Sequence, residues 1–168
     1  MQMFEKLPVM KSKIVIFLLS AIFLSINMSC GDKYGNKLGG DHIIPYVQIY
    51  TEIPFGTGGD DPLSWQNITR YFATTTPNPT AIGYKGHGII VFTSDLEDFH
   101  CYDATCTNCS DLESFITAKD LKGTTAVCPV CGTEFELFSG QAITNTEKIY
   151  PLKSYSITKV GEKLIVRN

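Results

Sequence analysis

The chain has 168 residues, a formal net charge of −3 and a hydrophobic content of 43%. This composition supports a globular core and excludes a chain that is disordered over most of its length. No run of basic residues occurs, so we expect no nucleic-acid partner.

Residues 1–29 have the pattern of a signal peptide. Lys11 and Lys13 precede an apolar stretch over residues 14–26, which is shorter than the roughly 20 residues that a membrane-spanning helix needs. The stretch ends in Ser29-Cys30-Gly31, and a small residue before a cysteine at this place resembles a bacterial lipobox. We therefore expect cleavage before Cys30 and lipid on Cys30. The alternative is an ordinary secretory signal with an incidental cysteine.

A lipid on Cys30 would place the protein in the bacterial cell envelope, anchored to a membrane and facing the periplasm or lying on the outer-membrane surface. Residues 30–43 are rich in glycine and poor in apolar side chains, which predicts a flexible tether. The remaining segment, residues 44–168, has the length of one ordinary domain.

Within this domain the apolar patterns predict mostly strands. Residues 44–51 form the first, and residues 54–62, with three glycines and two prolines, form a loop. Residues 63–73 are ambiguous, although the spacing of Trp65, Ile68 and Phe72 suits one face of a short helix. Further strands are predicted over residues 88–93, 99–104 and 133–138, followed by a hairpin of 154–160 and 163–167. The fold class is mainly β, a small barrel or sandwich.

Four cysteines form two Cys-x-x-Cys knuckles, Cys106 with Cys109 and Cys128 with Cys131. Each knuckle turns two sulfurs toward one point, so two facing knuckles can supply a tetrahedron of thiolates for Zn²⁺ or for a single iron. Gly132 permits a tight turn that leaves backbone amides free to approach the sulfurs, and Pro129 stiffens the same loop.

Other interpretations of the cysteines stay open. Export favours disulfides, which would run between the knuckles rather than within them, or the four thiols could be free and redox-active. Cys101 lies inside a predicted strand and is expected to be a buried core thiol. His100 is a spare ligand or, more often for such a residue, an exposed strand residue, and His42 and His87 show no ligand spacing.

Two segments of the sequence resemble the Rieske iron–sulfur domain. The run from Phe99 to Thr107 is similar to the strand and first cluster loop of that family, and the run from Val127 to Gly140 is similar to its second loop. More closely, residues 44–168 resemble a group of bacterial Rieske-like lipoproteins. The resemblance implies a Rieske-like β barrel or sandwich with a metal-binding subdomain of two facing loops, residues 104–110 and 126–133.

The sequence departs from the Rieske pattern at both histidine ligands. Cys106 and Cys128 match the two cysteines of the family, but Cys131 stands in place of the second histidine. Asn108 stands in place of the first, with Cys109 one residue later. The resulting all-cysteine set is more similar to a rubredoxin or zinc-ribbon site. The family also has a proline-containing loop over its cluster, whereas residues 142–150 contain no proline.

The signal segment bears on the choice of metal. A protein that crosses a membrane with a finished iron–sulfur cluster must cross folded, which calls for a twin-arginine signal. Here Lys11-Ser-Lys13 stands where an arginine pair would be needed. A chain threaded unfolded can still take up zinc afterwards, so we favour Zn²⁺, then a single iron, then a four-cysteine [2Fe–2S] cluster.

We therefore expect a membrane-anchored, non-enzymatic module with a structural zinc, which presents a surface to an unknown protein partner. The alternative is an electron carrier, or the redox component of an oxidoreductase, with iron or [2Fe–2S] at the same site. A third is a domain held by disulfides or active in thiol exchange. No catalytic triad, phosphate loop or dinucleotide fingerprint is present in the sequence.

Overall fold

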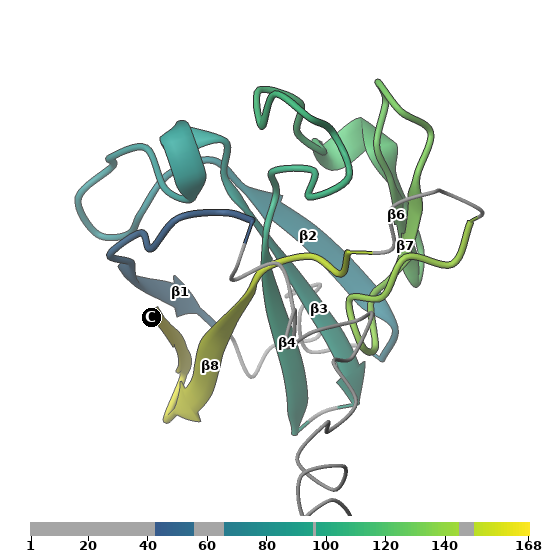
Figure 1. The fold of residues 1–168 in the computed structure, drawn as a ribbon. Helices are drawn as coiled ribbons and strands as arrows, with labels where there is room; N and C mark the ends of the chain where they lie inside the picture. The colour runs from purple at the N-terminus through teal and green to yellow at the C-terminus, as the bar shows by residue number, and fades with distance from the viewer. Residues whose placement is uncertain (1–42, 56–65, 96, 145–149) are drawn as a thin grey trace, which may run out of the picture. The chain divides into compact units, whose positions relative to one another are not determined.

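Strands form the regular structure in the computed structural model, which describes residues 43–55, 66–95, 97–144 and 150–168 (Figure 1). Residues 1–29, for which a signal peptide is predicted, and Cys30 and His42 lie outside these residues. The elements in chain order are β1 (Tyr50–Pro54), β2 (Ile68–Phe72), the 3₁₀ turn η3 (Tyr84–Gly86), β3 (Ile89–Asp95), β4 (Asp98–Asp103), the 3₁₀ turn η4 (Ala118–Asp120), β5 (Leu121–Lys122), β6 (Thr125–Val127), β7 (Glu134–Glu136), β8 (Ser154–Val160) and β9 (Lys163–Arg167).

Six of these strands form one antiparallel sheet in the order β1-β9-β8-β4-β3-β2. Figure 1 shows the sheet curling from β1 and β8 at one side, through β4 and β3, to β2 at the other. The curl follows the right-handed twist that accumulates across adjacent strands. A bulge between Thr93 and Asp95 adds a local bend at the end of the β3–β4 hairpin.

Both faces of β3 are buried, and the period-two alternation of the strand divides them between two cores. Ile90 and Phe92 belong to the site-side core, and Ile89 and Val91 belong to the base core. The site-side core comprises Ile90, Phe92, Tyr102, Ala104, Cys106, Cys109, Ile116, Ala126, Cys128, Phe135, Leu137 and Leu152. The base core comprises Ile49, Ile53, Phe55, Ile82, Ile89, Val91, Cys101, Tyr155, Leu164 and Val166.

A second, three-stranded sheet has the order β5-β6-β7. Ala126 on β6 pairs with Phe135 on β7, and both side chains are fully buried in the site-side core. The neighbours Glu134 and Glu136 are half-buried, so the alternation predicted for residues 133–138 holds in β7. Because β6 and β7 flank the second knuckle, this packing fixes that knuckle on the core.

The sequence predicts the strand content well. The mainly β class is confirmed, and the C-terminal hairpin has the predicted bounds, 154–160 and 163–167. The first strand begins later than expected: it spans Tyr50–Pro54, where β9 supplies the partner residues, instead of residues 44–51. The 3₁₀ turns and the short strands β5 and β6 were not expected.

The predicted helix over residues 63–73 is wrong in its described part, because Ile68–Phe72 forms β2 against β3. A separation of four residues, as between Ile68 and Phe72, fits the period of a strand as well as that of a helix. The run Ile-Thr-Arg-Tyr-Phe is β-branched or aromatic at four of its five positions, which suits an edge strand on a buried neighbour. Among the described residues no helix has the length and apolar character to cross a bilayer.

Candidate metal centre

The loop that carries the first knuckle begins at the end of β4, directly after the buried carboxylate of Asp103. Asp103 is fully buried and accepts hydrogen bonds from the Thr105 N–H at 2.8 Å, the Tyr84 N–H at 2.6 Å and the Tyr155 hydroxyl at 2.6 Å. Three donors compensate the cost of burying the carboxylate. They also fix the direction in which the chain enters the loop that carries Cys106.

Backbone pairing then closes this loop upon itself. Thr105 forms a bridge with Phe115, the Cys106 N–H donates to the Ser114 carbonyl at 2.8 Å, and the Ile116 N–H donates to the Ala104 carbonyl at 2.8 Å. The loop therefore projects as a hairpin-like arm. Cys106 sits at its start and Cys109 near its tip, and both belong to the site-side core.

The second knuckle is a turn between β6 and β7. The Cys128 N–H donates to the Thr133 carbonyl at 2.8 Å, and the Gly132 N–H donates to the Cys128 carbonyl at 3.0 Å. Gly132 has a φ of +71°, and a Cβ there would meet open space, so the positive φ is what makes glycine favourable. Pro129 is exposed beside it.

The two knuckles bring all four thiols together: every sulfur lies within 4.8 Å of every other. Cys106 Sγ lies 3.6 Å from Cys131 Sγ, and Cys109 Sγ lies 3.7 Å from Cys128 Sγ. Metal–sulfur bonds of 2.3 Å in a regular tetrahedron require sulfurs about 3.8 Å apart. The spacing of the thiols is thus close to that of a four-coordinate site.

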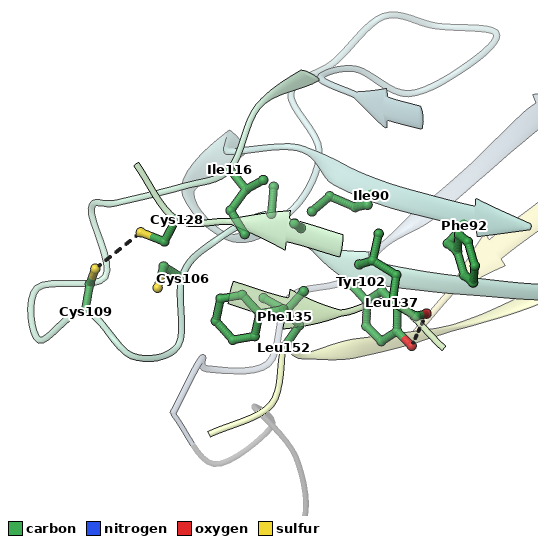
Figure 2. Close-up of a cluster of buried hydrophobic side chains, with 12 residues drawn as sticks. Ile90, Phe92, Tyr102, Cys106, Cys109, Ile116, Cys128, Phe135, Leu137 and Leu152 are labelled. Atoms are coloured by element: carbon green, nitrogen blue, oxygen red, sulfur yellow. Dashed lines mark hydrogen bonds between the residues drawn. The ribbon is translucent and has the colours of Figure 1, made fainter. Parts of the chain in front are cut away.

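Three of the four thiols are buried, and Figure 2 shows Cys106, Cys109 and Cys128 at one end of the site-side core. Cys131 is exposed, and its sulfur lies 3.1 Å from the Oγ1 of Thr133, which is 1% exposed. Three of the four candidate ligand residues are therefore buried, and the fourth lies at the surface. All five cysteines among the described residues are free thiols.

One thiol of the set is favoured in its ionised form. A hydrogen bond from the Cys106 thiol, followed by the amides of Val130 and Cys131, lowers the pKa of Cys128. The same contact with Cys128, together with burial, raises the pKa of Cys106. Burial raises the pKa of Cys109, although a hydrogen bond with Ser114 acts against it. A bound cation would supply the charge that keeps all four sulfurs ionised.

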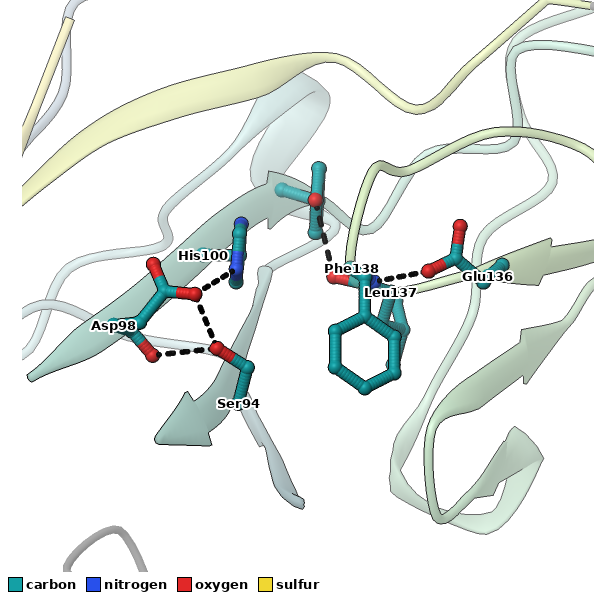
Figure 3. Close-up of polar contacts among 7 residues, drawn as sticks. Ser94, Asp98, His100, Glu136, Leu137 and Phe138 are labelled. Atoms are coloured by element: carbon teal, nitrogen blue, oxygen red, sulfur yellow. Dashed lines mark hydrogen bonds and ion pairs between the residues drawn. The ribbon is translucent and has the colours of Figure 1, made fainter. Parts of the chain in front are cut away.

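The structure separates the remaining candidates from this site. Cys101 is 2% exposed in the base core, in agreement with the prediction of a core thiol. His100 does not join the thiols. Its Nε2 lies 3.2 Å from Asp98 Oδ2 (Figure 3). Its ring stacks against Phe92 and Tyr102. His87 stacks on Phe115, with ring centroids 4.5 Å apart.

Several polar side chains around the knuckles were not found from the sequence. Thr133 contacts Cys131, Ser114 contacts Cys109, and the side chains of Thr107 and Asn108 bond to the backbone of Tyr150. Thr133 follows the second knuckle directly, so its adjacency was a usable signal. Tyr150 is far away in the sequence, and nothing in the pattern joins it to Asn108.

No family model matches the sequence, and the comparison with curated proteins gave no match. Solved structures that resemble the fold include a chain of the complex of reduced oxygenase and oxidized ferredoxin in carbazole 1,9a-dioxygenase. That chain is 17% identical with a TM-score of 0.45, and the match covers 72% of this chain and 94% of that one.

Two ferredoxins are also similar. The ferredoxin of carbazole 1,9a-dioxygenase from Nocardioides aromaticivorans IC177 is 15% identical with a TM-score of 0.39, over 70% of this chain and 97% of that one. The Sphingomonas yanoikuyae B1 ferredoxin is 18% identical with a TM-score of 0.41, over 64% and 93%. The function proposed below rests on the cysteine geometry and not on these likenesses.

Proposed function

We propose that this protein binds a single metal ion through Cys106, Cys109, Cys128 and Cys131. The observation that carries the proposal is the mutual approach of the four sulfurs within 4.8 Å. Two knuckles from different parts of the sequence meet here, and three of the thiols are buried in the site-side core. Four ionised sulfurs packed this closely would repel one another, and a bound cation removes that cost.

The sulfur spacing favours one ion over a [2Fe–2S] cluster. In such a cluster the thiolates bind in pairs, one pair on each iron, and sulfurs on different irons are separated by the additional iron–iron distance. The four sulfurs here lie around one point, with the cross-knuckle contacts at 3.6 and 3.7 Å. This arrangement suits a mononuclear Zn²⁺ or iron site.

Between these two metals we propose zinc in a structural role. The donor set is entirely thiolate and fills a tetrahedron, which leaves no open position for a substrate. The signal segment lacks an arginine pair, which fits uptake of the metal after export. Metal binding would join the two knuckles, and its free energy would stabilise the fold.

We also propose that lipid on Cys30 holds the domain at a membrane of the bacterial cell envelope, with residues 30–43 as the tether. The experiment is expression of the full chain and of Cys30→Ser in a bacterium, with separation of membrane and soluble fractions. The wild type should sediment with membranes and incorporate labelled fatty acid. A Cys30→Ser variant that does both equally well would contradict the lipid anchor.

The metal is tested on protein isolated from its native compartment. We expect a colourless protein with one zinc per chain and thiols that react only after a chelator is added. Visible absorption together with bound iron would show that the bound metal is iron and not zinc. Protein without metal, in which only the Cys101 thiol is free after unfolding, would support the disulfide interpretation and overturn the proposal.

A second candidate, electron transfer by a single iron, has one observation in its favour. Cys131 is exposed, and Val130 between the two cysteines of that knuckle is 70% exposed. A ligand residue at the surface gives a redox partner protein a short path to the metal. Loading the chain with Fe²⁺ and measuring reversible one-electron oxidation would test this candidate.

A further inference from the structure

Asn108, the residue where the Rieske pattern has a histidine, makes an unusual contact with a distant part of the chain. Its Nδ2 donates to the Tyr150 carbonyl at 3.1 Å, and its Oδ1 accepts from the Tyr150 N–H at 3.1 Å. The side-chain amide thus bonds to both backbone groups of one residue, as a neighbouring strand would. Thr107 adds a third bond, from its hydroxyl to the same carbonyl at 3.0 Å.

The contact depends on the asparagine side chain in particular. An aspartate would retain the acceptor but would have no donor for the Tyr150 carbonyl. A leucine or an alanine would leave both backbone groups of Tyr150 without these partners, and Tyr150 is only half-exposed. Thr107 bonds only to the Tyr150 carbonyl, so it could not replace Asn108 as acceptor for the Tyr150 N–H.

Asn108 is at the same time part of the first knuckle, because it lies between Cys106 and Cys109 and directly precedes Cys109. The residue therefore joins a candidate ligand on one side to Tyr150 on the other. Beyond Tyr150 the chain is bonded twice more: the Leu152 N–H donates to the Gly140 carbonyl at 2.9 Å, and the Lys153 carbonyl accepts from the Asp103 N–H at 2.8 Å. We name residues 150–153 the crossing segment.

The crossing segment thus contacts three regions that define the site. Tyr150 holds the first knuckle, Leu152 holds the turn after β7, and Lys153 holds the end of β4, where the first knuckle begins. Leu152 is 2% exposed within the site-side core, so burial fixes the middle of the segment. The first knuckle is consequently supported from outside by a segment that contributes no ligand.

We propose that Asn108 is a positioning residue, which clamps the first knuckle to the crossing segment and so holds Cys106 and Cys109 in the arrangement that retains the metal. This inference rests on the proposed metal site. Residues that orient metal ligands in this way change metal affinity by about 10- to 100-fold when they are lost. The clamp slows metal release by keeping the first knuckle from opening away from the second.

The test compares the full chain with Asn108→Ala and Asn108→Asp after zinc loading. We expect each variant to bind one zinc and to release it to an excess of a chromophoric chelator about 10- to 100-fold faster than the wild type. The Tyr150 amide should also exchange with solvent faster in both variants. An unchanged release rate or unchanged exchange at Tyr150 would overturn the proposal.

Two controls separate positioning from general loss of stability. Asn78→Ala and Asn78→Asp repeat the same chemical changes at an exposed asparagine, and they should leave zinc release within about twofold of the wild type. Val166→Ala removes a fully buried side chain from the base core and should lower global stability without changing zinc release. If Val166→Ala released zinc as fast as Asn108→Ala, the positioning role would be contradicted.

Should Asn108→Ala fail to fold, Thr107→Val removes one of the three bonds with little change in volume. It should speed zinc release and Tyr150 exchange by a smaller factor, and no change in either would count against the clamp. If the wild type bound no metal, the proposed function would fail. Exchange at Tyr150 in wild type and Asn108→Ala would then decide on the clamp, with equal rates overturning it.

Discussion

The turn that follows β7 rests on the ring of Tyr102, so closely that a Cβ on Gly140 would lie 2.6 Å from the Tyr102 Cε1. The Tyr102 hydroxyl donates to the Leu137 carbonyl at 3.1 Å, beside the same turn (Figure 2). The small sheet is therefore fixed to β4 at the opposite end of the site-side core from Cys106, Cys109 and Cys128 (Figure 2). The close packing of this turn on the Tyr102 ring depends on residue 140 being a glycine, which has no side chain.

Gly140→Ala should destabilise the protein more than the same change at Gly161. Both glycines have a positive φ, +73° and +59°, but a Cβ at Gly161 would meet open space. Gly161→Ala should cost about 1 kcal/mol of unfolding free energy from backbone strain alone. Gly140→Ala should cost about 1–3 kcal/mol more from the clash with the ring.

Urea denaturation of the two variants measures the difference. Placing Gly140→Ala in a Tyr102→Leu background supplies the control, because a smaller side chain removes most of the clash and should reduce the excess cost. Equal losses of unfolding free energy at the two glycines would show that Gly140 does not pack closely against the Tyr102 ring.

Removal of the metal should lower stability and should loosen one part of the domain more than the other. For a metal that binds only the folded chain, a free concentration 1,000-fold above Kd contributes about 4 kcal/mol to the unfolding free energy. Three candidate ligands lie in the site-side core, whereas the base core contains none. Amides in β5, β6 and β7 should therefore lose protection from hydrogen exchange before those in β1 and β9.

The measurement is denaturation with and without chelator, at several metal concentrations, together with residue-resolved hydrogen exchange. Addition of Mg²⁺, a hard cation that prefers oxygen ligands, is the control and should not restore the lost stability. Uniform loss of protection across both sheets would contradict the division into two cores.

Serine substitutions at Cys131 and Cys101 should give opposite results. Cys131 is exposed, so Cys131→Ser should scarcely change the stability of the metal-free protein but should weaken metal binding by removing one thiolate. Cys101 is 2% exposed among apolar side chains, so Cys101→Ser should cost about 1–3 kcal/mol for a buried hydroxyl and leave one metal per chain.

Metal titration and denaturation of the two metal-free variants check these expectations. The pair serves as its own control, because the chemical change is identical at both positions. Full metal retention in Cys131→Ser, with undiminished stability, would contradict the role of Cys131 as a ligand.

Stability should fall at alkaline pH through the buried thiol of Cys101. Burial, aided by the negative charge of Asp103, raises the pKa of this thiol from its ordinary value of 9.0. Above pH 9 the unfolded chain loses the proton while the folded chain keeps it, so the folded state binds more protons. The unfolding free energy is unaffected below that pH and then falls by about 1.4 kcal/mol per pH unit.

The comparison of wild type with Cys101→Ala, both loaded with metal, isolates this contribution. Denaturation midpoints between about pH 8 and pH 10 should fall more steeply in the wild type than in the variant. Parallel curves would mean that Cys101 does not contribute to the alkaline loss.

The sequence predicted those elements in which local pattern and tertiary partner agree. The C-terminal hairpin is one example, because its alternation and its Gly161-Glu162 turn favour the same register that the structure has. The prediction for Ile68 to Phe72 was wrong because a four-residue spacing fits the period of a helix and that of a strand. The choice between them depends on pairing with the edge of β3. Pairing with a distant strand is not visible in a local window.

The ligands of the site could be predicted from the sequence, but the contacts that support them could not. The spacing of the knuckles indicated four converging thiols, and the structure brings them within reach of one ion. The partner of Asn108 could not be predicted, because its contact with Tyr150 spans 42 positions and uses backbone groups, which leave no trace in residue identity. Thr133 and Ser114 were missed because short polar residues near a turn are common without any ligand contact.

The pairing of β1 with β9 has a consequence for the order in which the domain can be completed. Tyr50 lies opposite Arg167, so β1 finds its neighbour only after β9, far later in the chain, has become free to fold. Both knuckles emerge earlier and can meet while β1 still has an unpaired edge. Metal capture at that stage would hold a half-built sheet together, and a shortage of metal would leave its exposed edge open to association with other chains.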